Sequence, residues 1–197
     1  MQEKSTYCNK HFLSLILFFL IAVFYSGSVF SQENSVTDSL NRLLRQSRIK
    51  TDILTSLAAE YQYISPVKSL QVSCEALVTA RKEKNPTGEA YACYYIASNY
   101  LSLGQYDTCL KMLDRSEMIF SRLNNTEGLL HTVNARANLK YLQGKFDDAL
   151  EQFEDNLQKS EKGNLTRIQV SALLNIGRIN WLRGKPETAL RYYSDAL

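Results

Sequence analysis

The segment Leu173–Leu197, "LLNIGRINWLRGKPETALRYYSDAL", decides the fold because its skeleton recurs upstream at a constant spacing. The glycine of its Gly184-Lys185 pair recurs 40 residues earlier, and again 40 residues before that. The Ala189-Leu190 pair recurs as a small residue followed by leucine in three earlier units. A spacing held through four units is the signature of a repeat array. The glycines are Gly104, Gly144 and Gly184; the leucines are Leu70, Leu110, Leu150 and Leu190; the small residues are Ser69, Cys109, Ala149 and Ala189.

Each unit is predicted to be a pair of helices joined by a turn. In the third unit, the apolar residues between Phe146 and Leu157 fall at helical spacing on one face. Gly144 is expected to end the preceding helix in the left-handed conformation, and Pro186 to lie in the first turn of the last helix. The small residue before each leucine lets the two helices of a pair approach closely, because a large side chain would push them apart.

A pattern of small, aromatic and turn residues at matching places accompanies this spacing. It is carried by Ile96, Ala97, Tyr100, Gly104, Tyr106 and Leu113 in the second unit, and by Asn175, Ile176, Gly177, Gly184, Ala189, Tyr193 and Ala196 in the fourth. The array resembles the tetratricopeptide repeat (TPR) family, in a 40-residue version similar to that of bacterial signalling and regulatory proteins. The resemblance implies an all-α fold, a right-handed α-solenoid of TPR-like helix-turn-helix hairpins. The expected repeats are 50–89, 90–129, 130–169 and a truncated 170–197.

Two units depart from the family pattern. Arg136 and Lys140 stand where apolar residues are expected in the third unit. The first unit has Ser65-Pro66 in place of the turn glycine, and its first helix is out of register by one residue. The resemblance therefore does not predict how the first helix of the third unit packs.

The N-terminal residues have the composition of a targeting segment. Basic residues precede an apolar run over 12–24, and a short polar segment rich in small residues follows, which is the order of a secretory signal peptide. Residues 1–31 are therefore predicted to be a signal peptide, and the protein to be exported to the periplasmic or extracytoplasmic side of a bacterial membrane. An uncleaved anchor is the alternative, because the apolar segment extended to Phe30 approaches the ~20 residues that span a bilayer.

The segment 32–49 separates this N-terminus from the array. It is predicted to be a polar linker with a short amphipathic helix around Leu40, Leu43 and Leu44, which would cap the first repeat.

The composition and the reactive side chains argue against catalysis. The net charge is +3 and no long block of like charge occurs, so nucleic acid is not an expected partner. After the signal peptide the only histidine is His131, too little for a metal site or a Ser/His/Asp set. Three cysteines remain without a CxxC motif; Cys109 is expected to be a buried small residue, and a Cys74–Cys93 disulfide is left open. The chain is predicted not to be an enzyme and to hold no metal or cofactor.

In the resembling family the first helices of the repeats line a concave face. The positions carried over to this chain hold tyrosine, tryptophan, arginine and asparagine, residues suited to binding a polypeptide. The alternative is that the aromatic residues pack between repeats. The predicted partner-binding groove comprises Tyr91, Tyr94, Asn134, Asn138, Tyr141, Arg178 and Trp181, with His131, Ser171 and Leu174 at neighbouring positions.

These features predict a protein–protein interaction scaffold. The resemblance implies the extracytoplasmic sensory or interaction region of a bacterial signalling protein, similar to the N-terminal part of exported TPR-containing sensor histidine kinases or regulators. A free-standing exported TPR adaptor or chaperone-like scaffold is the alternative. The expected partner is a protein or peptide in the concave groove, with self-association through the uncapped C-terminal repeat, and with membrane contact only through the N-terminal segment or a further C-terminal region.

Overall fold

The structure, a computed structural model, describes residues 35–46 and 50–197, and the chain divides into two units, 1–46 and 47–197. In the first unit residues 35–46 form a helix; its role as a cap stays a prediction. The signal peptide predicted over 1–31 lies outside the described residues. Within the described part of the chain, no helix combines the length and the apolar character needed to cross a membrane.

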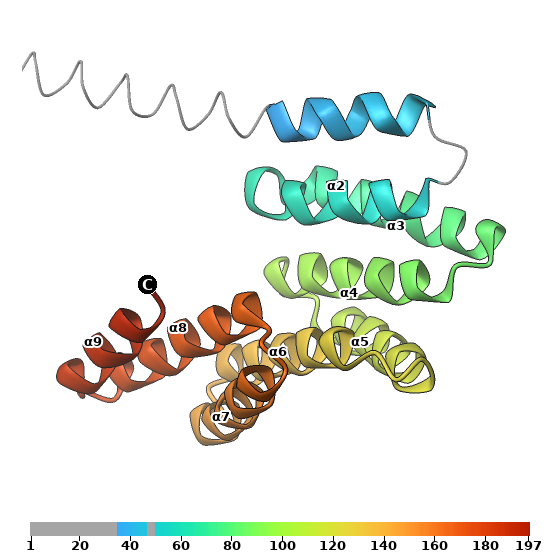
Figure 1. Ribbon diagram of the computed structural model, residues 1–197. Coiled ribbons are helices and arrows are strands. Elements are labelled where there is room, and N and C mark those ends of the chain that lie inside the picture. The colour runs from blue at the N-terminus through green and yellow to red at the C-terminus, as the bar shows by residue number, and fades with distance from the viewer. Residues whose placement is uncertain (1–34, 47–49) are drawn as a thin grey trace, which may run out of the picture. The chain divides into compact units, whose positions relative to one another are not determined.

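The second unit consists of helices joined in pairs by short turns (Figure 1). In each pair the two helices pack against each other, so the predicted all-α, TPR-like helical repeat fold is confirmed. The four hairpins are α2 (Thr51–Ile64) with α3 (Pro66–Glu83), α4 (Pro86–Ser102) with α5 (Tyr106–Arg122), α6 (Thr126–Leu142) with α7 (Phe146–Lys162), and α8 (Thr166–Leu182) with α9 (Pro186–Asp195).

The hairpins keep the spacing seen in the sequence. Helices α4, α6 and α8 begin at Pro86, Thr126 and Thr166, 40 residues apart, whereas α2 begins only 35 residues before α4. The predicted repeat limits at 90, 130 and 170 therefore fall inside these helices, because the sequence pattern aligns their interiors rather than their ends.

The small residue before each repeated leucine is buried in every hairpin. Ser69, Cys109 and Ala149 have no exposed surface, and neither does Ala189. Each is the fourth residue of the second helix of its pair. In the first hairpin the hydroxyl of Ser69 donates to the carbonyl oxygen of Ala58 on α2 at 2.8 Å, so the two helices approach at this position, as the small side chain predicts.

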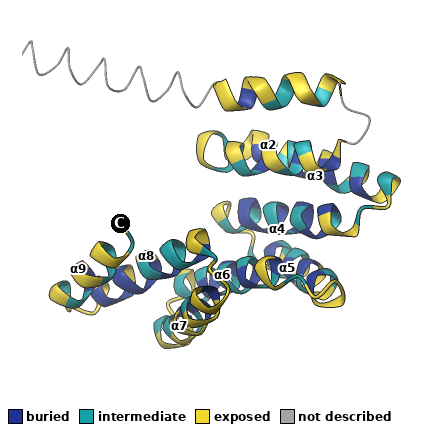
Figure 2. Cartoon of the chain, in the orientation of Figure 1, coloured by how far each residue is buried: buried dark blue, intermediate teal, exposed yellow. Residues whose placement is uncertain are grey.

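The first helices of the later pairs are buried on several sides. Figure 2 shows buried residues along α4 and α8, with exposed residues at the turns and over much of α9. Helix α8 packs against both α7 and α9, which explains its burial. Around Phe153 of α7, Ala137 of α6 and Ile176 and Ile179 of α8 form one fully buried cluster, which joins the third hairpin to the fourth.

Two kinds of turn require a positive φ angle. The turns inside the later hairpins place Gly104, Gly144 and Gly184 at φ between 69° and 77°, as predicted for glycines that end a helix. The turns between hairpins place Asn124 and Asn164 at φ 51° and 53°. Asparagine tolerates this left-handed conformation, and the backbone geometry therefore explains why asparagine occupies these two positions.

The charged residues of the third unit are accommodated by ion pairs. Nη2 of Arg136 lies 2.7 Å from Asp114 Oδ1 and 2.7 Å from Glu117 Oε2, both on α5. Lys140 Nζ lies 3.9 Å from Asp148 Oδ2 of α7. The basic side chains of α6 thus bridge to both neighbouring second helices.

The first hairpin is closed by a carboxylate rather than by an N-cap of its own. Glu83, at the end of α3, accepts hydrogen bonds from the Lys50 and Thr51 backbone amides and from the Thr51 hydroxyl, the last at 2.6 Å. The Thr51 hydroxyl and these amides lower the pKa of Glu83. The contact satisfies backbone donors at the start of α2, where the side chain of the N-cap residue Lys50 makes no capping hydrogen bond.

Candidate functional site on the inner face of the array

The first helices of the four hairpins form one continuous layer. Helix α2 contacts α4, α4 contacts α6, and α6 contacts α8. Within residues 50–197, no comparable contact joins α3 to α5, α5 to α7, or α7 to α9. The first helices are therefore closer together than the second helices, and they form the inner face of the array; the second helices form the outer face.

A hollow of about 290 Å³ lies on the inner face and is built by all four hairpins. Acidic, basic, aromatic and hydroxyl side chains line it. They are Thr55, Ser56, Ala59 and Glu60 of α2, Tyr91 and Tyr95 of α4, Glu127 and His131 of α6, and Arg167 of α8.

Aromatic contacts hold the rings of this region in place. The ring of Tyr91 meets Phe120 of α5 edge-on, with centroids 4.9 Å apart. Tyr94 meets Tyr95 edge-on with ring centroids 5.0 Å apart, and its centroid lies 5.6 Å from that of the His131 ring. Phe120 has no exposed surface. The half-buried rings are therefore supported from the core and need no rearrangement to meet a partner.

The titratable rings in and beside the hollow are uncharged at neutral pH, and burial moves their pKa values further in that direction. Burial raises the pKa of Tyr94 to about 12, and it also raises the pKa of Tyr91 and of Tyr95. Burial lowers the pKa of His131, and the positive charge of Arg167 acts in the same direction, against the charge of Glu127. The fixed charges of the hollow are therefore those of the two glutamates and of Arg167.

The predicted groove residues fall into two groups. Tyr91 lines the hollow, and Tyr94 packs beside it in the core cluster around Ala97 and Leu113. For Tyr94, packing between repeats describes its surroundings better than exposure to a partner, because its ring is enclosed by Tyr95 and His131.

The other predicted residues lie on α6 and α8. Nδ2 of Asn134 donates to the hydroxyl of Ser171 at 2.9 Å and so joins the two helices. The guanidinium of Arg178 lies over the ring of Tyr141, 5.4 Å from its centroid. Asn138 is half-buried, and Trp181 is 58% exposed. Arg178 and Trp181 therefore present free surface, whereas Asn134 and Tyr141 also contribute to packing.

Sequence reasoning missed several residues of the hollow. Tyr95 lies one turn of helix after Tyr91, and Glu127 lies one turn before His131. Arg167 occupies the position equivalent to Glu127, 40 residues on. The 40-residue spacing therefore indicates that Glu127 and Arg167 are equivalent. The predicted groove includes Tyr94, three residues after Tyr91, instead of Tyr95, four residues after it, and it does not include the starts of α6 and α8.

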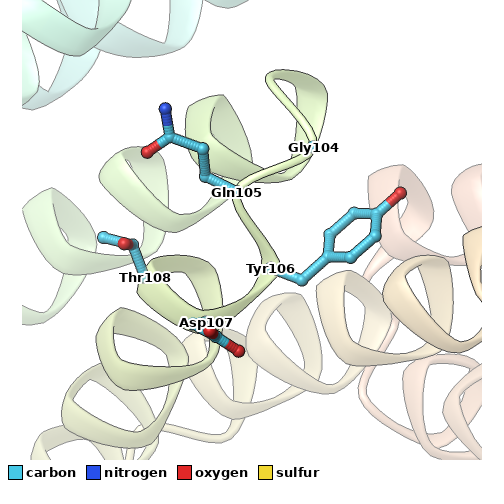
Figure 3. A pocket seen from close by; sticks show the side chains of 5 residues that line it. All are labelled: Gly104, Gln105, Tyr106, Asp107 and Thr108. Carbon is cyan, nitrogen blue, oxygen red and sulfur yellow. The ribbon is translucent and has the colours of Figure 1, made fainter.

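Two other hollows lack a comparable set of side chains. One of about 400 Å³ lies at the α4–α5 turn and is lined by the five consecutive residues 104–108. Figure 3 shows that their side chains spread apart rather than converge. Another, of about 340 Å³, lies between α4 and α5 beside Glu89, whose carboxylate is already held by Arg81 and Arg115. Neither brings together unpaired polar groups.

The described residues provide little redox or metal chemistry. No group of histidine, cysteine, aspartate or glutamate that could hold a metal ion occurs among them. Cys74, Cys93 and Cys109 are free thiols, so the Cys74–Cys93 disulfide left open by the sequence is not formed. Burial raises the pKa of Cys93 and of Cys109 to about 11, which keeps both thiols neutral. Cys109 is a buried small residue, as predicted.

The fold and its inner face define an all-α repeat protein of the TPR-like class. No protein-family model matches the sequence, and no curated protein matches it. Among solved structures, the chain is similar to aspartyl phosphate phosphatase F from Bacillus subtilis, with a TM-score of 0.62 and 20% identity over 76% of this chain and 40% of that one. The chain thus spans less than half of that phosphatase.

Two further structures share the arrangement. BtubC (BKLC) from P. vanneervenii matches with a TM-score of 0.58 and 16% identity, over 84% of this chain and 70% of that one. The TPR-like repeats of a putative kinesin light chain from Podosopora anserina match with a TM-score of 0.51 and 13% identity, over 84% and 86% of the two chains. At these identities the likeness establishes the fold.

Proposed function

We propose that the array is a protein–protein interaction scaffold that binds a partner polypeptide along its inner face. The observation that carries this proposal is the hollow to which α2, α4, α6 and α8 all contribute. A helical array offers such an extended inner surface because each repeat adds side chains to it. The half-buried tyrosines of the hollow, together with Arg178 and Trp181 on α8, are residue types that dominate the binding energy of interfaces.

The proposed setting is the extracytoplasmic sensory or interaction region of a bacterial signalling protein. The order of basic, apolar and polar residues over 1–31 supports export, and the 40-residue spacing supports the resemblance to bacterial regulatory arrays. A free-standing exported adaptor or chaperone-like scaffold is the second candidate, supported by the same features. Export is tested by fusing residues 1–40 to alkaline phosphatase in a bacterial cell, since that enzyme is active only outside the cytoplasm; an inactive, stable fusion would refute export.

The exposed residues of α8 provide the test of the inner face. Trp181→Ala and Arg178→Ala are each expected to reduce recovery of the partner about tenfold, because both side chains present free contact surface. Partner recovery is measured by mass spectrometry after pull-down from extracts of the source cells. Helicity is measured by circular dichroism and should change little.

Arg191→Ala is the matched control, since Arg191 is exposed on α9 of the outer face. It should leave partner recovery unchanged. If Trp181→Ala or Arg178→Ala instead melts the array, that side chain belongs to the core and the groove assignment is wrong.

We also propose self-association through the outer side of the last hairpin. Leu110 and Leu150 are half-buried, and Leu150 packs against the cluster that includes Ile176 of the next hairpin. Leu190 occupies the equivalent place and is 62% exposed. An exposed apolar side chain at this place is the proposed contact with a second copy of the chain.

Leu190→Glu is expected to shift the protein from an associated form to a monomer, because it places a charge in the proposed contact. Sedimentation velocity at several protein concentrations measures the change. Leu103→Glu, at another exposed leucine, is the control and should not shift it. A wild-type protein that stays monomeric at all concentrations would exclude this contact.

A further inference from the structure

We infer that the hollow on the inner face binds a basic side chain, lysine or arginine, presented by the partner polypeptide. This inference rests on the proposed function, because it names the chemistry that the inner face recognises. It is carried by three features of the hollow: its carboxylates without a lysine or arginine partner, its tyrosine rings without a cation over them, and its size.

The carboxylates of the hollow lack basic partners. Glu60 on α2 and Glu127 on α6 are both exposed and lie on either side of α4. Among the described residues, neither forms an ion pair with a lysine or arginine. Glu127 has only the imidazole of His131, with Nε2 at 3.9 Å from Oε1, and burial lowers the pKa of that imidazole.

Several carboxylates elsewhere in the array are held by basic side chains. Glu89 lies between Arg81 and Arg115, and Asp114 and Glu117 share Arg136. Glu60 and Glu127 differ from these three carboxylates because they stand beside one hollow without a lysine or arginine partner. The two glutamates carry two negative charges and Arg167 carries one positive charge, so one negative charge in the lining of the hollow is not balanced.

The tyrosines of the hollow supply the second feature. A cation is attracted to the face of an aromatic ring within about 6 Å of its centroid. In the part of the chain that the structure describes, such contacts occur at Tyr61 and Tyr141, and no cation lies over Tyr91 or Tyr95. Both of these rings line the hollow, and edge contacts from Phe120 and Tyr94 hold them in place.

The size of the hollow fits a side chain better than a small-molecule ligand. Its volume of about 290 Å³ falls at the lower limit of the ~300–1,000 Å³ that pockets for drug-sized ligands enclose. A lysine or arginine side chain can place its stem against the rings and its charged end between the carboxylates. An acidic side chain would meet Arg167 but would also be repelled by Glu60 and Glu127.

The experiment titrates the full chain with three capped peptides, Gly-Gly-Arg-Gly-Gly, its Gln analogue and its Glu analogue, and follows the imidazole and tyrosine ring signals by NMR. The Arg peptide is expected to shift the His131 and Tyr95 signals and to bind at least fivefold more tightly than the other two. The double variant Glu60→Gln/Glu127→Gln should weaken its binding at least fivefold, and Arg167→Ala should strengthen it. Glu75→Gln, at an exposed carboxylate on α3 outside the hollow, is the control and should change nothing.

Circular dichroism of each variant should show unchanged helicity, because the substituted groups are exposed. Three results would overturn the inference: no binding of the Arg peptide, equal binding by the double variant, or tighter binding of the Glu peptide. None of these would touch the proposed function, which is tested separately by the partner recovery and the helicity of Trp181→Ala and Arg178→Ala.

Discussion

Replacing Phe153 with alanine is expected to lower the free energy of unfolding by about 3–5 kcal/mol, the range for removing a large aromatic side chain from a core. Phe153 has no exposed surface and belongs to the cluster that joins the third hairpin to the fourth. The loss combines the transfer of the ring to water with the cavity left between α6, α7 and α8. Urea unfolding followed by circular dichroism at 222 nm measures it.

The substitution should also change how the array unfolds. In a repeat array, stability is the sum of the hairpins and of the contacts between neighbours. Because the cluster around Phe153 includes Ile176 and Ile179 of α8, its loss weakens the coupling of the last hairpin to the rest, and the transition should broaden. Leu103→Ala, at a leucine that is 53% exposed, is the control and should cost less than about 1 kcal/mol. Equal losses for the two variants would show that Phe153 is not in the core.

Enlarging the small side chain at Ala149 is expected to destabilise the array by about 1–3 kcal/mol, the usual cost of overpacking a filled core. Ala149→Leu adds three carbon atoms at a position with no exposed surface, where α7 packs beside Ala137 of α6. The added atoms must displace either the neighbouring side chains or the helix pair itself. Thermal unfolding followed by circular dichroism should show a clearly lower Tm.

Cys109→Ala is the matched control for this position, because Cys109 is the equivalent residue of the second hairpin and alanine is no larger. It should cost less than about 1.5 kcal/mol. A Tm for Ala149→Leu equal to that of the wild type would mean that the helices of a pair do not meet at the small residue, and the account of the hairpins would then need revision.

The fold was readable from the sequence because each repeat encodes it separately. The glycines of the turns inside the hairpins take positive φ angles as expected, and the small residues before the repeated leucines are buried in all four units. The contact between Glu83 and the start of α2 in the first hairpin could not be predicted from the repeat pattern. Glu83 reaches the start of α2 across 32 residues of sequence, and it does so in a unit that lacks the turn glycine of the others.

The candidate site was only partly readable, for a geometric reason. A period of 40 residues shows which positions are equivalent, but not which of two neighbours on a helix turns toward the inner face. The sequence predicts Tyr94 rather than Tyr95 in the groove, yet Tyr95 lines the hollow and Tyr94 packs against His131. The contribution of Glu60 was out of reach, because α2 is out of register with the other first helices.

The contacts between hairpins have a mechanical consequence. Each second helix packs against the first helix of the next hairpin but not against the next second helix, so a change in the distance between two second helices is taken up at the contact with the first helix that lies between them. The array is therefore expected to change its curvature through small rotations of one hairpin against the next. A ligand bound across α2, α4, α6 and α8 would fix this curvature. Its binding would therefore also fix the orientation of the two ends of the array relative to each other.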